Sequence, residues 1–206
     1  MERFRVLPLL LCALALLAAA CNGGADVTTG DEEPGTHAGY NDADITFLQQ
    51  MIPHHEQAVE MAELVPDRTE RTELIQLAED IVASQQAEIA EMERMLAEAG
   101  ASDEREGHDM EEMDDTGTME DMEGMEGMMR EEDMTRLAGL QGTEFDLLFL
   151  DMMVAHHEGA IVAAERVIEG GENPGVGQLA EGIIAEQQAE IDQMTAWRGE
   201  WGSEAR

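Results

Sequence analysis

Apolar side chains recur every three to four residues in four segments of the chain, a pattern typical of helices that bury one face. The first segment begins after Asp42 or Asp44, both favourable N-cap types, and ends at residues 66–67. Its buried stripe is predicted to consist of Phe47, Met51, His55, Ala58 and Ala62. The third segment begins near Thr143 and ends at the glycines of 170–171. Its corresponding stripe is Phe149, Met153, His157, Ala160 and Ala164.

The second and fourth segments carry apolar stripes with a period near 3.5, each interrupted by one glutamine. These stripes are Ala78, Val82, Gln85, Ile89, Met92 and Leu96 in the second segment, and Ala180, Ile184, Gln187, Ile191 and Met194 in the fourth. Each pair of segments forms a helical hairpin, so the predicted fold class is an all-α four-helix bundle. Residues 47–58 align with 149–160, and the Gln-Gln-Ala-Glu-Ile string of 85–89 recurs at 187–191. The two hairpins are therefore predicted to be copies of one another.

The N-terminal region has the composition of an export signal. Residues 1–20 contain two arginines, a short apolar run and terminal small residues. Cys21 follows in a sequence that resembles a bacterial lipobox, and an ordinary secretory cleavage site is the alternative. Cys12 would be removed with the signal, which leaves Cys21 without a disulfide partner. We expect an exported lipoprotein, anchored in the cell membrane through Cys21 and facing outside the cytoplasm.

The rest of the chain divides by composition. The predicted regions are a flexible tether over 21–40, the first hairpin over 41–99, an acidic methionine-rich loop over 100–134 and the second hairpin over 135–200. The loop lacks apolar periodicity and is predicted to be solvated and disordered. The chain has 47 acidic against 11 basic side chains, a net charge of -36. Such charge excludes nucleic acid as a partner and favours cations.

Two His-His pairs carry the candidate chemistry. The pairs are His54 with His55 and His156 with His157, and each follows a methionine, Met51 or Met153, by three and four residues. At about 100 degrees per residue, both imidazoles of a pair flank the direction of that methionine. Facing hairpins would bring the two sets together, with Met92 and Met194 as further ligands and Met61 and Met152 at the periphery.

This ligand set favours particular metals. Thioether with imidazole favours Cu(I), whereas imidazole with carboxylate would also hold Cu(II) or Zn(II). The alternative is that the histidines are hydrogen-bonded core residues and the methionines are apolar filler. Gln85 and Gln187 are predicted to form an interhelical hydrogen bond, and a role beside a ligating histidine is the alternative. Glu56 and Glu158 have the same two alternatives, solvation or support of a ligand.

The loop adds thioethers of its own. Eight methionines lie between 110 and 134, together with His108 among many carboxylates. They are Met110, Met113, Met119, Met122, Met125, Met128, Met129 and Met134. We expect Met119, Met122, Met125 and Met128 to bind Cu(I) or Ag(I), because thioethers bind soft ions without being lost to disulfide formation. An acidic linker without a metal role is the alternative.

Enzymatic signatures are missing from the sequence. No glutamate stands three residues before a paired histidine, as di-iron carboxylate bundles require, and the zinc-protease spacing also fails. No phosphate loop, nucleophile elbow or Cys-x-x-Cys motif occurs. We therefore expect a protein that is not an enzyme, with a metal-dependent oxidoreductase as the weaker alternative.

The string Phe-Leu-x-x-Met-Ile-x-His-His-x-x-Ala at 47–58, repeated with valine for isoleucine at 149–160, resembles the hallmark of the bacterial DUF305 family. The resemblance covers about residues 40–200 and implies a ferritin-like four-helix bundle. Some exported members are linked to copper or silver binding and resistance. The ligand candidates that it carries over are Met51, His54, His55, Met153, His156 and His157. These observations together predict an extracytoplasmic Cu(I), Ag(I) or Cu(II) binder, with a structural or interaction lipoprotein as the alternative, and they leave homo-oligomerisation open.

Overall fold

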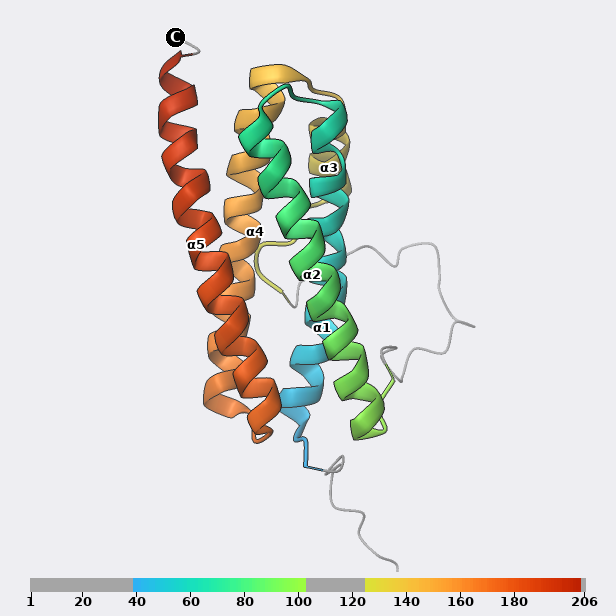
Figure 1. Ribbon diagram of the computed structural model, residues 1–206. Coiled ribbons are helices and arrows are strands. Elements are labelled where there is room, and N and C mark those ends of the chain that lie inside the picture. Colours follow the sequence, from blue (N-terminus) through green and yellow to red (C-terminus); the bar gives the residue numbers. More distant parts are fainter. Residues whose placement is uncertain (1–38, 103–124, 205–206) are drawn as a thin grey trace, which may run out of the picture. The chain divides into compact units, whose positions relative to one another are not determined.

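The computed structural model describes residues 39–102 and 125–204, and within these ranges it contains helices and no strands (Figure 1). The helices are α1 (Asp42–Glu63), α2 (Thr72–Ala99), α3 (Glu131–Ala138), α4 (Gly142–Gly170) and α5 (Pro174–Glu204), with a 3₁₀ turn at Val65–Asp67. α1 packs along α2, α4 packs along α5, and α1 meets α4 between the two hairpins. The predicted all-α bundle of two hairpins is confirmed.

The start of α1 corrects one expectation. Its N-cap is Asn41 and neither Asp42 nor Asp44, because Asp44 occupies the third helical position of a capping box. The Asn41 side chain accepts a hydrogen bond from the Asp44 backbone N–H at 3.0 Å, and the Asp44 carboxylate accepts from the Asn41 N–H at 2.9 Å. α4 begins at Gly142, next to the expected Thr143.

The core consists of two apolar clusters, and residues at equivalent positions of the two repeats lie in different clusters. Phe47 belongs to the first cluster and its counterpart Phe149 to the second, whereas Ala62 belongs to the second and Ala164 to the first. Each cluster therefore combines the open end of one hairpin with the turn end of the other. This exchange is what a twofold relation between the duplicated hairpins produces. All five residues of the stripe predicted for α1, and all five for α4, are buried.

Two buried carboxylates at repeat-related positions join the hairpins. Asp44 accepts hydrogen bonds from the backbone N–H groups of Glu172 and Asn173 in the α4–α5 turn, each at 3.1 Å. Asp146 accepts from the Nε of Arg71, beside the α1–α2 turn, at 3.1 Å. Each carboxylate thus holds the turn of the opposite hairpin, which fixes how the two hairpins align.

Among the described helices, α4 is long and apolar enough by length and composition to cross a membrane, with a mean hydropathy of 1.4 over 18 residues. Half of that segment is buried inside the bundle. Its buried face includes Asp146, His156 and His157, so its apolar character serves the core of the bundle.

The end of the acidic loop differs from the expectation for 100–134. Residues 125–130, here called the strap, cross the α1–α4 surface, and α3 follows at once. The Gln57 amide donates to the Met129 carbonyl oxygen at 2.8 Å and accepts from the Met129 N–H at 2.6 Å. Met125 is 9% exposed in the first cluster. The segment is ordered because its methionines reach apolar surface and its backbone finds polar partners.

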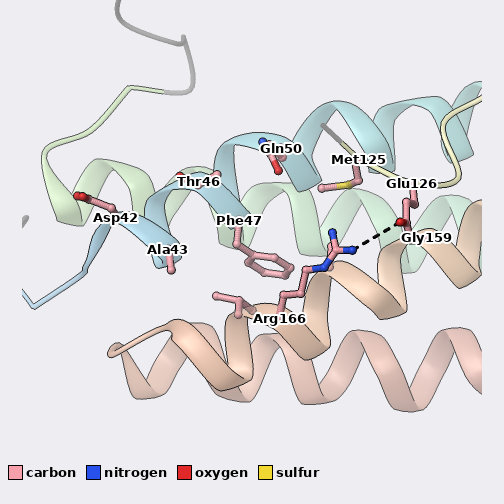
Figure 2. A pocket seen from close by; sticks show the side chains of 11 residues that line it. Asp42, Ala43, Thr46, Phe47, Gln50, Met125, Glu126, Gly159 and Arg166 are labelled. Carbon is pink, nitrogen blue, oxygen red and sulfur yellow. Dashed lines mark ion pairs between the residues drawn. The ribbon is translucent and has the colours of Figure 1, made fainter. Parts of the chain in front are cut away.

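Two glycines allow the strap to lie against α4. At Gly127 the backbone has φ of +90°, and an added Cβ would lie 2.7 Å from the Ala155 carbonyl oxygen. At Gly159 an added Cβ would overlap the Glu126 carbonyl. Figure 2 shows Glu126 beside Gly159 and its ion pair with Arg166. The two charged groups lie 3.5 Å apart, next to a cavity of about 320 Å³. Both charged side chains are exposed, so this ion pair contributes little and the backbone approach dominates.

We expect Gly159→Ala to lower the free energy of unfolding by about 1–3 kcal/mol, because the strap or α4 must shift to admit the methyl group. Urea unfolding followed by circular dichroism measures the effect. Gly182→Ala in α5 is the matched control, since nothing lies within 4 Å of its Cβ. This control is expected to raise the free energy of unfolding by about 0.5–1 kcal/mol. Equal effects of the two substitutions would contradict the docking of the strap.

Candidate functional site

A layer of four histidines separates the two apolar clusters. This histidine layer consists of His54 and His55 on α1 and His156 and His157 on α4, and all four side chains are 0% exposed. The rings of His54 and His156 lie 3.7 Å apart between their centroids, across the α1–α4 contact. Within the pairs the centroids are 6.4 Å and 6.3 Å apart. The structure therefore brings together the two pairs that the sequence places 102 positions apart.

Two glutamates that were not predicted complete the layer. The His55 Nε2 lies 2.8 Å from the Glu88 carboxylate, and the His157 Nε2 lies 2.6 Å from the Glu190 carboxylate. Glu88 and Glu190 are repeat-related and belong to the duplicated Gln-Gln-Ala-Glu-Ile string. That string was the available signal, but its contact with the histidines depends on how α2 packs on α1 and α5 on α4.

The other polar candidates differ in burial and in hydrogen bonding. Glu56 and Glu158 are exposed, in agreement with solvation. Gln85 and Gln187 are buried, but the Oε1 atoms of both, and the Nε2 of Gln187, have no hydrogen-bond partner. The expected interhelical hydrogen bond of Gln187 is therefore absent in the described part of the chain.

Methionines flank the histidine layer. Met51 and Met92 lie in the first cluster and Met153 and Met194 in the second, and all four are 0% exposed. Each of Met51 and Met153 precedes its histidine pair by one helical turn, which places thioether and imidazoles on one face. The ligand candidates predicted on the four long helices thus share the interior.

The other predicted sulfur-containing residues fall into three groups: buried in the second cluster, packed at the first cluster, and outside the described residues. Met61 and Met152, expected at the periphery, are buried in the second cluster, because the faces of α1 and α4 that carry them turn inward there. Met125 lies in the first cluster and Met128 packs against it. Met119, Met122 and Cys21 lie outside the described residues.

Burial lowers the pKa of three of these imidazoles and keeps them neutral. Desolvation is the main cause that lowers the pKa of His54 and of His55 to about 3, and neighbouring histidines lower both further. The pKa of His156 falls well below its ordinary value for the same reasons. Burial, followed by the charge of Glu190, raises the pKa of Glu88 to about 7. Neutral imidazole is the form that binds metal ions.

Several ring nitrogens have no partner. Within residues 39–102 and 125–204, the Nδ1 atoms of all four histidines and the Nε2 of His156 are buried without a hydrogen bond. The His54 Nε2 lies 3.3 Å from the Glu126 carbonyl oxygen. Buried polar atoms are nearly always paired, so such a concentration is unusual. Among the described residues, no group of three or more His, Cys, Asp and Glu side chains is spaced as a metal site. The chemistry available is imidazole and thioether ligation.

Comparisons with known proteins agree with this arrangement. The family model described as a domain of unknown function, DUF305, matches residues 44–198. An uncharacterised protein, L153, of Acanthamoeba polyphaga mimivirus is 46% identical over 55 residues, which is 27% of this chain and 36% of that protein. A structure from Streptomyces coelicolor, described as a candidate secreted DUF305 protein, is 29% identical with a TM-score of 0.66. The match covers 78% of this chain and 94% of that one.

A second solved structure is described with metals. CopM in its Cu(I)-bound form is 29% identical, with a TM-score of 0.60, over 77% of this chain and 96% of that one. CopM is also described in Cu(II)-bound and silver-bound forms. The similarity to these structures supports a metal-binding role for the fold.

The lowered histidine pKa values predict acid sensitivity. Their contribution to stability is fully present above about pH 6.5 and is lost toward about pH 3, because the unfolded chain binds protons that the folded chain rejects. His54 and His55 are each expected to lower the free energy of unfolding by up to about 2 kcal/mol at pH 5. Glu88 acts in the opposite sense, since its contribution is present below pH 4.5 and lost as the pH rises through about 7.

Comparison with a variant that lacks two of the histidines isolates their contribution to the pH dependence of stability. Urea unfolding of metal-free protein between pH 7 and pH 5 should show a steeper loss of stability for the unchanged chain than for a His54→Leu, His156→Leu variant. The surface carboxylates are common to both chains, so their titration cancels. Parallel profiles would contradict the neutral burial of these two rings.

Proposed function

Because the chain belongs to the DUF305 family, we propose that it is an extracytoplasmic metal-binding protein whose preferred ion is Cu(I), with Ag(I), Cu(II) and Zn(II) as less preferred ions. Its role would be copper homeostasis or resistance, in which the metal is bound as cargo and no reaction is catalysed. The observation that carries the proposal is the histidine layer with its unpartnered nitrogens. A buried lone pair without a donor costs free energy, and a bound cation would satisfy it.

The ligand types support a soft ion. The buried imidazoles of His54, His55, His156 and His157 lie between clusters that contain buried methionines. The proposed ligands on the four long helices are these histidines with Met51, Met153, Met92 and Met194. Thioethers are poor ligands for hard cations but bind Cu(I) and Ag(I) well. CopM, which has a similar fold, is described with both of these metals.

The strap extends the proposed ligand set. Met125 and Met128 pack on the first cluster and bring the end of the acidic loop to the site. Their neighbours Met119 and Met122 stay predictions from composition. The net charge of -36 would raise the local concentration of any cation without selecting one.

Export and anchoring complete the proposal. The signal-like residues 1–20 and the lipobox-like position of Cys21 are its basis in the sequence. The Streptomyces coelicolor protein, described as a candidate secreted protein, supports export. A surface location would let the protein bind copper before the ion reaches the cytoplasm.

A structural role for the histidines is the second candidate, and one observation favours it. The bonds from His55 to Glu88 and from His157 to Glu190 satisfy one nitrogen of each ring without any metal. On this view the layer fixes the register of the helices. The view gives no partner to the remaining nitrogens, so we favour the metal.

Changing all four paired histidines to leucine is expected to lower the affinity for the most tightly held Cu(I) by at least about 100-fold, a loss that corresponds to about 2.8 kcal/mol. Leucine fills the space of each ring, and the loop methionines stay available for weaker binding. Competition of the purified full chain with a chromogenic Cu(I) chelator measures the loss.

The matched control is Glu56→Gln with Glu158→Gln, which changes exposed residues beside the same histidines. It should leave the affinity unchanged. If the leucine variant loses stability but holds Cu(I) as the unchanged chain does, the structural role is correct and the metal site is elsewhere or absent.

Replacing Met51 and Met153 by leucine tests whether their thioethers bind the metal ion. Leucine preserves volume, so the fold should lose less than about 1.5 kcal/mol per site. Cu(I) affinity is expected to fall about tenfold or more, while Zn(II) affinity changes little, because only the soft ion depends on sulfur. Met95→Leu, in the same core but outside the proposed ligand set, should alter neither affinity. Equal losses for both metals would rule out thioether ligation.

A further inference from the structure

We infer that Glu88 and Glu190 are positioning residues that hold the proton of His55 and of His157 on Nε2, so that Nδ1 of each ring is the atom offered to the metal. The inference rests on the proposed function, which it deepens by naming the ligating atoms. It also assigns different tasks to the two members of each pair.

The first step is the repetition of the contact. His55 and Glu88 are 33 positions apart in the chain, and so are His157 and Glu190. In both cases the carboxylate lies at hydrogen-bond distance from Nε2 and leaves Nδ1 without a partner. Two copies of the sequence, packed in separate hairpins, have thus formed the same arrangement. An incidental surface contact would not be expected twice.

The second step locates the proton. An ionised carboxylate can only accept, so opposite it the ring must donate from Nε2. A proton on Nδ1 would be a buried donor with no acceptor, since that atom has no partner in the structure. A ring with a single proton therefore carries it on Nε2 and keeps its lone pair on Nδ1. Metal binding at Nδ1 then displaces no proton from the ring.

The third step concerns direction. Glu88 lines a cavity of about 500 Å³ between α2 and α5, and its side chain is 16% exposed. The His55 ring is 0% exposed, so Nε2 points toward the bundle flank that Glu88 occupies. Glu190 has a similar exposure of 12% beside a fully buried His157. In each pair the carboxylate takes the outer nitrogen and leaves the other to the interior.

The contrast with the other pair members sharpens the assignment. His54 and His156 face each other across α1 and α4, and no carboxylate of the described residues is their partner. Their rings are not held in one tautomer by a charged acceptor. We therefore assign oriented ligands to His55 and His157 and adaptable ligands to His54 and His156. A carboxylate behind a ligating imidazole fixes the ring and increases its basicity.

The experiment uses nitrogen-15 NMR of the histidine rings in the metal-free full chain. The shifts of Nδ1 and Nε2 distinguish the two tautomers directly. We expect Nε2–H for His55 and His157 in the unchanged chain. Finding Nδ1–H for either ring would overturn the inference without any substitution.

Variants then link the tautomer to the metal. In Glu88→Gln with Glu190→Gln, the amide oxygen still accepts from Nε2, so the tautomer and most of the Cu(I) affinity should persist. In Glu88→Leu with Glu190→Leu the acceptor is lost. Mixed tautomers and an affinity loss of about 10–100-fold are expected. If the leucine variant does not fold, the glutamine variant and the unchanged chain still decide the matter, since loss of the tautomer in the glutamine variant would contradict the inference.

Glu186→Leu is the matched control. Glu186 lines the same cavity and has the same carboxyl group, but it is exposed and, among the described residues, makes no hydrogen bond to a histidine. The Glu186→Leu variant should keep the Nε2–H tautomer and the Cu(I) affinity. A loss of affinity equal to that of the Glu88→Leu, Glu190→Leu variant would mean that the charge of the carboxylate acts, and that its hydrogen bond does not. Failure of the unchanged chain to hold Cu(I) would refute the proposed function, whereas the tautomer measurement would still stand as a test of Glu88 and Glu190.

Discussion

The burial of four imidazoles between two apolar clusters is the constraint on which the rest of the structure depends. Water is excluded from all four rings. Burial lowers the pKa of His54, His55 and His156, so the neutral form of these three rings persists. Apolar packing on both sides of the layer holds the rings in place. The same packing leaves ring nitrogens without hydrogen-bond partners among the described residues. Such nitrogens destabilise the fold if they serve only as core, but they are available to bind a metal ion.

Duplication explains how a short motif makes a two-sided site. Each hairpin supplies one histidine pair, one flanking glutamate and its methionines, and the approximate twofold relation brings the copies face to face. Asp44 and Asp146 secure this relation, because each binds near the turn of the opposite hairpin. A shift of one hairpin along the other would separate the histidine pairs and break both anchors together. The geometry of the site and the stability of the fold are therefore coupled.

The strap breaks the symmetry at one pair of repeat-related positions. Gln57 and Gly159 occupy equivalent places after the two histidine pairs, yet one binds the strap backbone and the other makes room for it. The Glu126 carbonyl consequently approaches His54 but no equivalent group approaches His156 in the described residues. The two halves of the layer thus differ in their surroundings, although their helices are copies.

The sequence alone determined the helices, their buried stripes and the duplication, because these follow from a period of 3.6 residues and from local repetition. It also identified the histidine pairs and the methionines one turn before them. Tertiary structure decided the partners: Glu88 reaches His55 only because α2 packs on α1, and the strap docks only where Gly159 lacks a side chain. The inward position of Met61 and the missing bond of Gln187 have the same origin. A pattern gives the face on which a residue lies, whereas the group that it meets depends on how two surfaces pack.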